Sequence, residues 1–374
     1  MGNALEEHYD YLSDARRLEK FEQAVSRAVM PGDRVADIGC GFGVLGMMCL
    51  KAGAAHAWGI DETPAIEIAR ETVARGGLAD RYTCLHESSF RAELPGPVDI
   101  VICDHVGYFG FDYGIVAALG DARRRFLKPG GKVMPERIVL QVAAAQSPEC
   151  RKLATAWISE PVPAEFHWLR EYGVNSRHAH QFAASAIASA PAELGTIDLR
   201  ADTPDHLSFA ATLEATRDCE LDGLAGWFAC EIFDGVWMTN SPLSAEQIRR
   251  AQAFLPFETP LAVQTGDIVE VTVAIRHEAT LIAWTARVKR TGQAVRQSTW
   301  ASAILDPKDR TPPAARVPQL SRAGEARRAL LALIDGQATN AEIERAMLRD
   351  HPDLFPSREQ IERFVRSELN RSSQ

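Results

Sequence analysis

A short apolar strand that runs directly into a glycine-rich turn is the feature that most constrains how this chain folds. Residues 35–39 read VADIG, residues 39–43 read GCGFG, and residues 45–53 have the apolar spacing of a helix that ends at Gly53. Glycine adopts backbone conformations that other residues avoid, and it lets a ligand approach the backbone closely. A strand, a glycine turn and a helix in this order predict the start of an α/β sheet.

The segments that follow continue to alternate between strands and helices. The fourth strand, VDIVICD at residues 98–104, is almost wholly apolar, as expected for a central parallel strand that is covered on both faces. This order predicts a Rossmann-type, doubly wound parallel sheet, in which ligands bind at the carboxyl ends of the strands. The further predicted segments are strands at 55–61, 82–88, 98–104 and 132–142, and helices at 65–77 and 118–131.

The carboxyl ends of the first two strands carry the residues expected to bind a cofactor. The helix N-terminus after the glycine turn favours a carboxylate, and Asp61 can accept both hydroxyls of a ribose. A G-x-G-x-x-G spacing that ends at Gly46 keeps NAD as an alternative, but an acidic residue two places before the first glycine is the pattern for the amino group of S-adenosylmethionine (AdoMet). The predicted AdoMet-binding residues are Asp37, Gly39, Cys40, Gly41, Gly43, Asp61 and Glu62, with Ser88, Ser89 and Phe90 beside the adenine.

Three segments together resemble the protein arginine methyltransferases. Residues 12–21 (LSDARRLEKF) carry that family's Asp-x-x-Arg at Asp14 and Arg17. Residues 35–54 resemble its glycine-rich motif almost position for position, and residues 130–140 (GGKVMPERIVL) resemble its G-x-x-x-P-D/E-R. The resemblance implies a methyltransferase that uses AdoMet and releases S-adenosylhomocysteine (AdoHcy), with Arg17 on the cofactor's carboxylate.

The resemblance also implies the order of the domains. After the sheet, the family has a β-barrel interrupted by a helical arm used in dimerisation, so a homodimer is expected by analogy. The last segment has three amphipathic patterns, which predict a small helical module similar to a winged helix. It either presents a peptide or partner protein to the catalytic domain or packs on the barrel. The predicted parts are a helical cofactor lid (1–30), the AdoMet-binding domain (31–140), the acceptor-binding barrel (141–305) with an arm near 150–190, a linker (306–324) and the C-terminal module (325–374).

The loop after the fourth strand departs from the family at the place where the acceptor arginine binds. The family holds the guanidinium between two glutamates in the pattern S-E-x-M-G-Y-x-L-x-x-E, and this chain reads CDHVGYFGFDY at 103–113. With the Gly-Tyr pair fixing the register, Asp104 replaces the first glutamate, Tyr113 replaces the second, and Asp112 is displaced by one residue. The family's Thr-His-Trp loop is also missing, and residues 248–250 (Ile-Arg-Arg) occupy its place.

These departures leave the acceptor open. Asp104 and Asp112 can form a rebuilt clamp. Alternatively, His105 can take a proton from another acceptor, since the unperturbed pKa of a histidine is about 6.5. We expect methyl transfer to a nitrogen of a protein, peptide or arginine-like acceptor. Two alternatives are a tailoring O- or N-methyltransferase for a natural product or peptide, with His105 as base, and a non-catalytic AdoMet-binding scaffold. The predicted catalytic residues are Asp104, which also touches the cofactor, His105, Tyr108, Asp112 and Tyr113.

Charge and cysteine spacing argue against several other classes. The 374 residues carry a formal charge of −9, which disfavours a nucleic-acid-binding protein. The seven cysteines form no CxxC pair, so we expect reduced thiols and no metal site. No apolar run is long enough to span a membrane, and no signal-peptide pattern is present, so we expect a cytoplasmic protein with no membrane partner.

Overall fold

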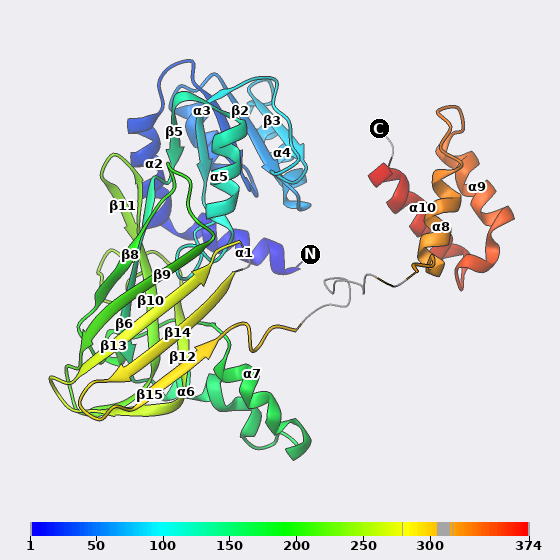
Figure 1. Cartoon of the computed structure of the whole chain (residues 1–374). Coiled ribbons are helices and arrows are strands. Elements are labelled where there is room, and N and C mark those ends of the chain that lie inside the picture. The colour runs from blue at the N-terminus through cyan, green and yellow to red at the C-terminus, as the bar shows by residue number, and fades with distance from the viewer. Residues whose placement is uncertain (1, 279, 305–314, 316, 373–374) are drawn as a thin grey trace. The chain divides into compact units, whose positions relative to one another are not determined.

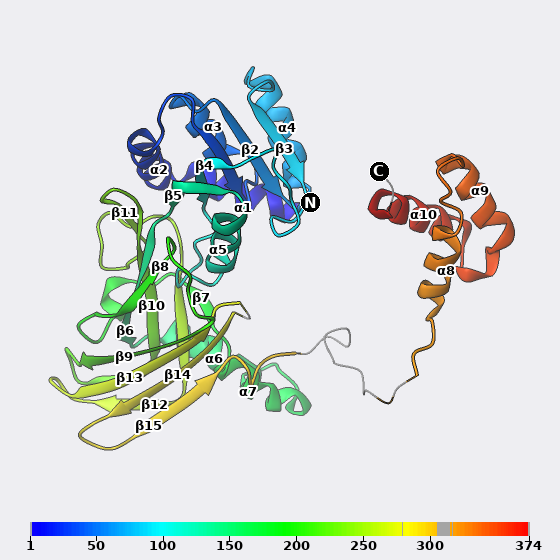
Figure 2. The same cartoon turned by 45° about the horizontal axis from the view of Figure 1, so that its top comes forward.

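The computed structural model describes residues 2–278, 280–304, 315 and 317–372, and the chain forms two compact units, Met1–Ile304 and Leu305–Gln374. The first unit begins with a five-stranded parallel sheet in the order β3-β2-β1-β4-β5, which confirms the predicted doubly wound architecture (Figure 1). Right-handed crossovers place α3 and α4 on one face of this sheet and α5 on the other (Figure 2). The elements are β1 (Arg34–Ile38), α3 (Val44–Lys51), β2 (His56–Asp61), α4 (Ala65–Arg75), β3 (Tyr82–His86), β4 (Val98–Cys103), α5 (Ile115–Arg125) and β5 (Leu127–Met134).

The largest differences from the predicted segments lie between residues 118 and 142. The helix expected to continue to residue 131 ends at Arg125, and the sequence LKPGGKVM belongs to β5. The single strand expected at 132–142 is two strands, because Pro135 has no N–H for a sheet ladder. The second of them, β6 (Arg137–Ala145), pairs with β10 and β8 in another sheet. The predicted domain boundary at residue 140 therefore falls inside β6.

Two helices precede the sheet, where a helical cofactor lid was predicted. The helices are α1 (Gly2–Ser13) and α2 (Ala15–Ala28). Asp14 caps the second of them, because its carboxylate accepts the backbone N–H of Arg17 at 3.3 Å. The buried face of α2 includes Phe21 and Val25 in the core, and this packing fixes Arg17 at the edge of the sheet.

Two antiparallel sheets follow and form the predicted barrel-like domain. One has the order β7-β12-β10-β6-β8, with β11 paired to β10, and the other has the order β15-β14-β13-β9. Along β13, buried and more exposed residues alternate, so each strand turns its apolar side chains toward the space between the sheets. The strands are β7 (His178–His180), β8 (Ala192–Asp198), β9 (His206–Glu214), β10 (Cys219–Phe233), β11 (Val236–Thr239), β12 (Gln252–Val263), β13 (Ile268–Arg276), β14 (Leu281–Val288) and β15 (Ala294–Ser298).

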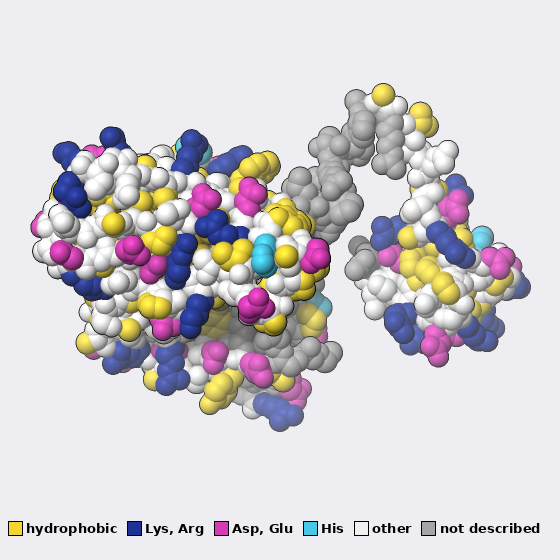
Figure 3. Space-filling view, turned by 90° about the horizontal axis from the view of Figure 1, so that it is seen from below, with side chains coloured by type: hydrophobic (Ala, Val, Ile, Leu, Met, Phe, Trp, Pro, Cys, Tyr) yellow, Lys and Arg dark blue, Asp and Glu magenta, His cyan; other side chains and the backbone are white. Residues whose placement is uncertain are grey.

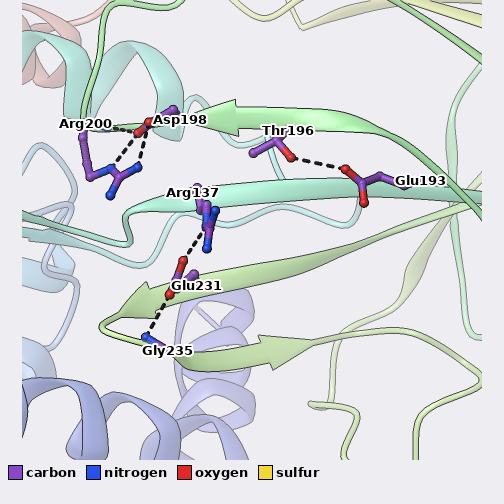
Figure 4. Close-up of polar contacts among 7 residues, drawn as sticks. All are labelled: Arg137, Glu193, Thr196, Asp198, Arg200, Glu231 and Gly235. Carbon is purple, nitrogen blue, oxygen red and sulfur yellow. Dashed lines mark hydrogen bonds and ion pairs between the residues drawn. The ribbon is translucent and has the colours of Figure 1, made fainter.

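The arginine of the P-E-R motif stabilises the passage from the first sheet into the barrel. Arg137, at the start of β6, pairs with the buried carboxylate of Glu231 on β10 (Figure 4). Glu231 also accepts the backbone N–H of Gly235 at 2.8 Å, in the turn that leads to β11. At the end of β8, Asp198 pairs with Arg200. The motif that supported the family resemblance therefore has a structural role here.

Residues 148–174 form a helical segment, whereas the arm was predicted near residues 150–190; residues 178–180 of that range instead form β7, which pairs with β12 in the barrel sheet. The arm contains α6 (Pro148–Thr155) and α7 (Arg170–Val174), with 3-10 turns between them. Arg151 ties it to the barrel by donating to the carbonyl oxygen of Phe257 at 2.7 Å. The arm exposes several large apolar side chains, each at least 37% accessible. They are Leu153, Trp157, Ile158, Phe166 and Trp168.

The second unit has its own small core. Its three helices are α8 (Arg322–Leu331), α9 (Asn340–Asp350) and α10 (Arg358–Ser372). A capping box formed by Thr339 and Glu342 begins α9. The described residues of this unit form helices without the strands of a winged helix. Of the predicted linker, residues 306–314 and 316 lie outside the described residues, and its last residues already belong to α8.

Charged side chains of both signs are interspersed on the face of the first unit that Figure 3 presents. Within the described ranges, no helix is long and apolar enough to cross a membrane. The same residues contain no cluster of three or more His, Cys, Asp or Glu side chains suited to a metal ion.

Candidate functional site

A cavity of about 670 Å³ lies at the carboxyl ends of the parallel strands. His8, Tyr11 and Leu12 of α1 form part of its wall, so the N-terminal helix covers the predicted cofactor site. Glu278, beyond β13, also reaches it. Nearly all the predicted cofactor-binding residues line this cavity. They are Arg17, Asp37, Gly39, Cys40, Gly41, Asp61, Glu62, Ser88, Ser89, Phe90 and Asp104.

The glycine turn brings the backbone to the cavity in a way that other residues could not. Gly39 and Gly41 have φ values of +64° and +52°, in the left-handed region. A Cβ atom on Gly39 would overlap the imidazole of His105, and one on Gly41 would lie 2.6 Å from the ring of His8. Gly43, the remaining predicted glycine, does not line the cavity. It is the N-cap of α3 and faces the hydroxyl of Tyr82.

Asp37 is a buried carboxylate at the end of β1. It accepts the N–H of Gly46 at 2.8 Å and the hydroxyl of Tyr82 at 3.3 Å. Burial nevertheless raises the pKa of Asp37 from 3.8 to about 7, because desolvation outweighs these two hydrogen bonds. An ammonium group would stabilise the ionised form, so this carboxylate suits the amino group of AdoMet.

Asp61, at the end of β2, links the glycine turn to the start of the loop after β2. One carboxylate oxygen accepts the N–H of Gly41 at 2.8 Å. The other accepts both the N–H and the hydroxyl of Thr63, at 2.8 and 2.6 Å. Each carboxylate oxygen can accept more than one hydrogen bond, so Asp61 retains acceptor capacity for the hydroxyls of a ribose.

Arg17 and Asp104 form an ion pair between α2 and the end of β4. Their side chains are 6% and 10% exposed, and both line the cavity. The guanidinium of Arg17 also lies 4.4 Å from the ring centroid of Tyr11. Burial lowers the pKa of Arg17 to about 10, and the positive charge of Arg250 adds to this effect. Arg17 Nε is buried without a hydrogen-bond partner among the described residues, so a bound carboxylate can satisfy it.

These observations fit the cofactor that the sequence predicts. The two glycines form a cradle in which an added Cβ would collide with His105 or His8, two side chains of the cavity wall. Asp37 and Asp61 offer acceptors for an amino group and a ribose. Arg17 lines the same cavity and offers a cation for a carboxylate.

The acceptor loop places Asp112 away from this cavity. Its carboxylate accepts the N–H of Phe109 at 2.8 Å and pairs with Arg177, which lies between the arm and β7. The side chain is 1% exposed and is not part of the cavity wall. The predicted clamp of Asp104 with Asp112 is therefore not assembled, because Asp112 already closes the loop onto an internal arginine.

The other predicted catalytic residues lie close to the cavity. His105 is part of its wall and packs against Gly39. Tyr113 also lines it, and its ring is 5.5 Å from that of Tyr108 in an edge-to-face arrangement. Burial, and then the hydrogen bond with Tyr108, raise the pKa of Tyr113. Tyr113 therefore stays protonated at neutral pH and is unsuited to act as a base.

A second, smaller cavity of about 220 Å³ adjoins the first. The two share Tyr11, Arg17 and Tyr113. The sequence identified Arg249 and Arg250 only as occupants of the missing Thr-His-Trp loop. It did not identify His8 or Tyr11, because one His and one Tyr on an amphipathic helix give no distinctive signal. The wall of the second cavity consists of Asp10, Tyr11, Asp14, Arg17, Tyr108, Tyr113, Arg249, Arg250 and Ala251.

Comparison with known proteins gives consistent matches over the first unit. A family model described as ribosomal protein L11 methyltransferase (PrmA) matches residues 18–141. Protein arginine N-methyltransferase 1 of Dictyostelium discoideum is 25% identical over 274 residues, which cover 71% of this chain and 80% of that protein. An arginine N(omega)-methyltransferase of Streptomyces achromogenes subsp. streptozoticus is 27% identical over 282 residues, covering 72% of this chain and 74% of that protein.

A solved structure shows the same fold. The Trypanosoma brucei PRMT1 enzyme-prozyme heterotetrameric complex with AdoHcy matches with a TM-score of 0.69 and 20% sequence identity. The match covers 78% of this chain and 96% of that chain, so it includes the barrel as well as the parallel sheet.

Proposed function

We propose that this chain, an AdoMet-dependent methyltransferase that resembles the protein arginine methyltransferases, methylates a nitrogen of an arginine-like acceptor. The observation that carries the proposal is the environment of Asp104. This carboxylate faces the cofactor cavity and holds a guanidinium, that of Arg17. A carboxylate that pairs with a guanidinium inside the protein is suited to bind that of an acceptor.

The cavity residues divide the work of binding between them. Asp37 binds the amino group, Asp61 the ribose and Arg17 the carboxylate of the cofactor, while the backbone at Gly39 lies against it. When bound, AdoMet supplies a methyl group activated by its positively charged sulfur. Because Arg17 then has a second carboxylate to bind, Asp104 is released to hold the acceptor. Holding the acceptor nitrogen in line with the methyl group is the main requirement of such a transfer.

His105 supports a second candidate function. It lies in the cavity wall, follows Asp104 in the chain and packs against Gly39. An imidazole there can take a proton from a hydroxyl or neutral amine. The alternative is therefore a tailoring O- or N-methyltransferase for a natural product or peptide.

The arm supports a proposal of dimerisation. The apolar side chains that it exposes include Trp157 and Trp168, at 40% and 61% accessibility. Exposed apolar side chains that gather on one element mark protein interfaces. We propose that the arm joins two copies of this chain, and a monomeric mass in light scattering at micromolar concentration contradicts this. The cytoplasmic location and the peptide-presenting role of the C-terminal module stay predictions.

The acceptor can be identified with methyl-labelled AdoMet. Purified protein is incubated with labelled AdoMet and a cell extract of its source, and the labelled products are separated by size and hydrolysed. Recovery of methylarginine supports the proposal. Label recovered on oxygen supports the second candidate instead, and the absence of labelled product with AdoHcy release at the background rate contradicts both.

A further inference from the structure

Arg250 is a buried arginine without an anionic partner. Only 8% of it is exposed, yet its guanidinium makes no hydrogen bond or ion pair with any residue that the structure describes. It lies 4.8 Å from the ring centroid of Tyr11 and 5.5 Å from that of Tyr113. Aromatic rings attract a cation, but they do not satisfy the five donors of a guanidinium. Arg250 lines the second cavity, so the unused donors of its guanidinium are available to an anion that enters there.

The second cavity, which Arg250 lines, has an excess of positive charge. Arg249 and Arg17 are in the same wall. Of the two carboxylates there, Asp14 is engaged by the backbone N–H groups of Arg17 and Arg249, at 3.3 and 2.7 Å, and Asp10 is exposed to solvent. Arg17 itself is paired with a carboxylate of the first cavity, so Arg250 is the buried cation of this wall that lacks one.

The two buried arginines also affect each other. After burial, the positive charge of Arg250 is the largest influence that lowers the pKa of Arg17. An anion placed at Arg250 would relieve this repulsion. This anion would be a group other than the carboxylate of the cofactor, because Arg250 does not line the cofactor cavity.

We propose that Arg250 binds a carboxylate of the acceptor, so that the substrate is a small molecule with a reactive nitrogen at one end and a carboxylate at the other. This inference rests on the proposed function and specifies its substrate class. Tyr11, Arg17 and Tyr113 line both cavities, so one molecule can extend from the cofactor site to Arg250. The volume of the second cavity is about 220 Å³, below the range of about 300–1,000 Å³ that is typical of pockets for drug-sized ligands. This size suits one end of a small substrate.

The forked geometry of the guanidinium favours a carboxylate, which it can bind through two parallel hydrogen bonds. An arginine inside a protein chain has no free carboxylate on its main chain. Free arginine and related amino acids carry one. The proposal therefore favours a free amino acid over an internal residue of a protein as the acceptor.

L-Arginine and L-argininamide are a suitable pair of probes, because they share the guanidinium and differ at the carboxylate. Their affinities for the full-length protein saturated with AdoHcy are measured by isothermal titration calorimetry. We expect L-arginine to bind at least about tenfold more tightly, as for a charge-assisted hydrogen-bonded pair. Arg250→Gln should remove this preference, and Arg250→Lys should restore part of it. Arg287→Gln, which changes an exposed arginine on β14, is the matched control.

The outcomes separate this inference from the proposed function. Equal affinities for the two probes, no binding of either, or a preference that survives in Arg250→Gln each overturns the carboxylate site. An unchanged AdoHcy affinity shows that Arg250→Gln is folded. Methylarginine found only inside proteins overturns the carboxylate site but leaves the proposed function intact. A carboxylate preference without methylarginine from the extract leaves the site standing and overturns the proposed function.

Discussion

The two adjoining cavities of the first unit are built in different ways. The larger one consists mainly of backbone turns and carboxylates at the ends of consecutive parallel strands, such as Asp37 and Asp61. The smaller one is assembled from side chains of α1, the loop after β4 and the segment before β12. The geometry of a binding site formed by strand ends and turns cannot change much unless the sheet itself is disrupted. A binding site formed by side chains from distant segments can change its ligand specificity by substitution while the fold is kept. The cofactor side follows the family pattern and the acceptor side departs from it for this reason.

The largest effect that we expect comes from adding a methyl group to the glycine cradle. Gly39→Ala places a Cβ at a φ of +64° and against the ring of His105. Strain and overpacking of this kind cost about 3 kcal/mol, or about 100-fold in AdoHcy affinity measured by calorimetry. Gly130→Ala is the control, because its φ is +75° and no atom lies within 4 Å of the added Cβ. Similar AdoHcy affinities for both variants would contradict the cradle.

A slightly smaller effect, confined to turnover, is expected at Asp104. Asp104→Asn keeps the shape and removes the charge that binds the acceptor guanidinium. A charge-assisted hydrogen bond contributes about 1.5–3 kcal/mol, so kcat/KM should fall about 10- to 100-fold. AdoHcy affinity should be retained or increased, because Arg17 loses its competing partner. Unchanged turnover would show that the acceptor does not bind at Asp104.

The buried carboxylate of Asp37 gives the cofactor side a pH dependence. Burial raises its pKa from 3.8 to about 7, so from about pH 4 to pH 7 the folded chain holds a proton that the unfolded chain lacks. The contribution of Asp37 to stability therefore declines as the pH rises through this window.

The affinity for AdoHcy runs in the opposite direction. The ammonium group of AdoHcy pairs with the ionised carboxylate, so its affinity should fall as the pH drops below about 7, by at most about tenfold per pH unit. Calorimetry between about pH 5.5 and 8 measures this effect. The control is Asp37→Asn, in which the dependence should disappear, and a dependence that persists there would assign it to another group.

The smallest effect is expected from the C-terminal unit. It has a separate core that includes Leu330, Ile343 and Val365. Deletion of residues 320–374 should therefore leave AdoHcy affinity and turnover of a small acceptor within about twofold of the full chain. Loss of turnover on protein or peptide acceptors alone would support the presentation role. Loss of turnover on a small acceptor would mean that residues 320–374 also contribute to binding of that acceptor.

The parts that the sequence predicted are those that local patterns determine. Gly39, Gly41 and Asp61 could be assigned because the order of strands and turns dictates where they meet. Gly43 follows the same motif, yet it packs against Tyr82, since the turn has already rotated into α3. In the barrel, Pro256 and Pro260 interrupt the sequence of β12, so no regular alternation marks this strand.

The acceptor side depends on contacts between distant segments, and these leave no local signal. Asp112 was predicted to face the acceptor, but Gly107 and Gly110 bond to each other and close the loop. This closure turns Asp112 toward Arg177, which lies between α7 and β7. The two arginines at 249 and 250 were visible in the sequence. The burial of Arg250 between two tyrosines was not.

The division between the two cavities is tested most directly by the AdoHcy affinities of Asp61→Ala and Arg250→Gln, measured side by side by calorimetry. Asp61 accepts the N–H of Gly41 and lines the cofactor cavity, where we propose that it binds both hydroxyls of the ribose. Loss of two hydrogen bonds to a charged group should weaken AdoHcy binding by about 30-fold or more. The account predicts this loss in Asp61→Ala and a change of less than about twofold in Arg250→Gln. An equal loss of AdoHcy affinity in both variants would mean that the second cavity binds the cofactor, and the separation of cofactor and acceptor sites would be wrong.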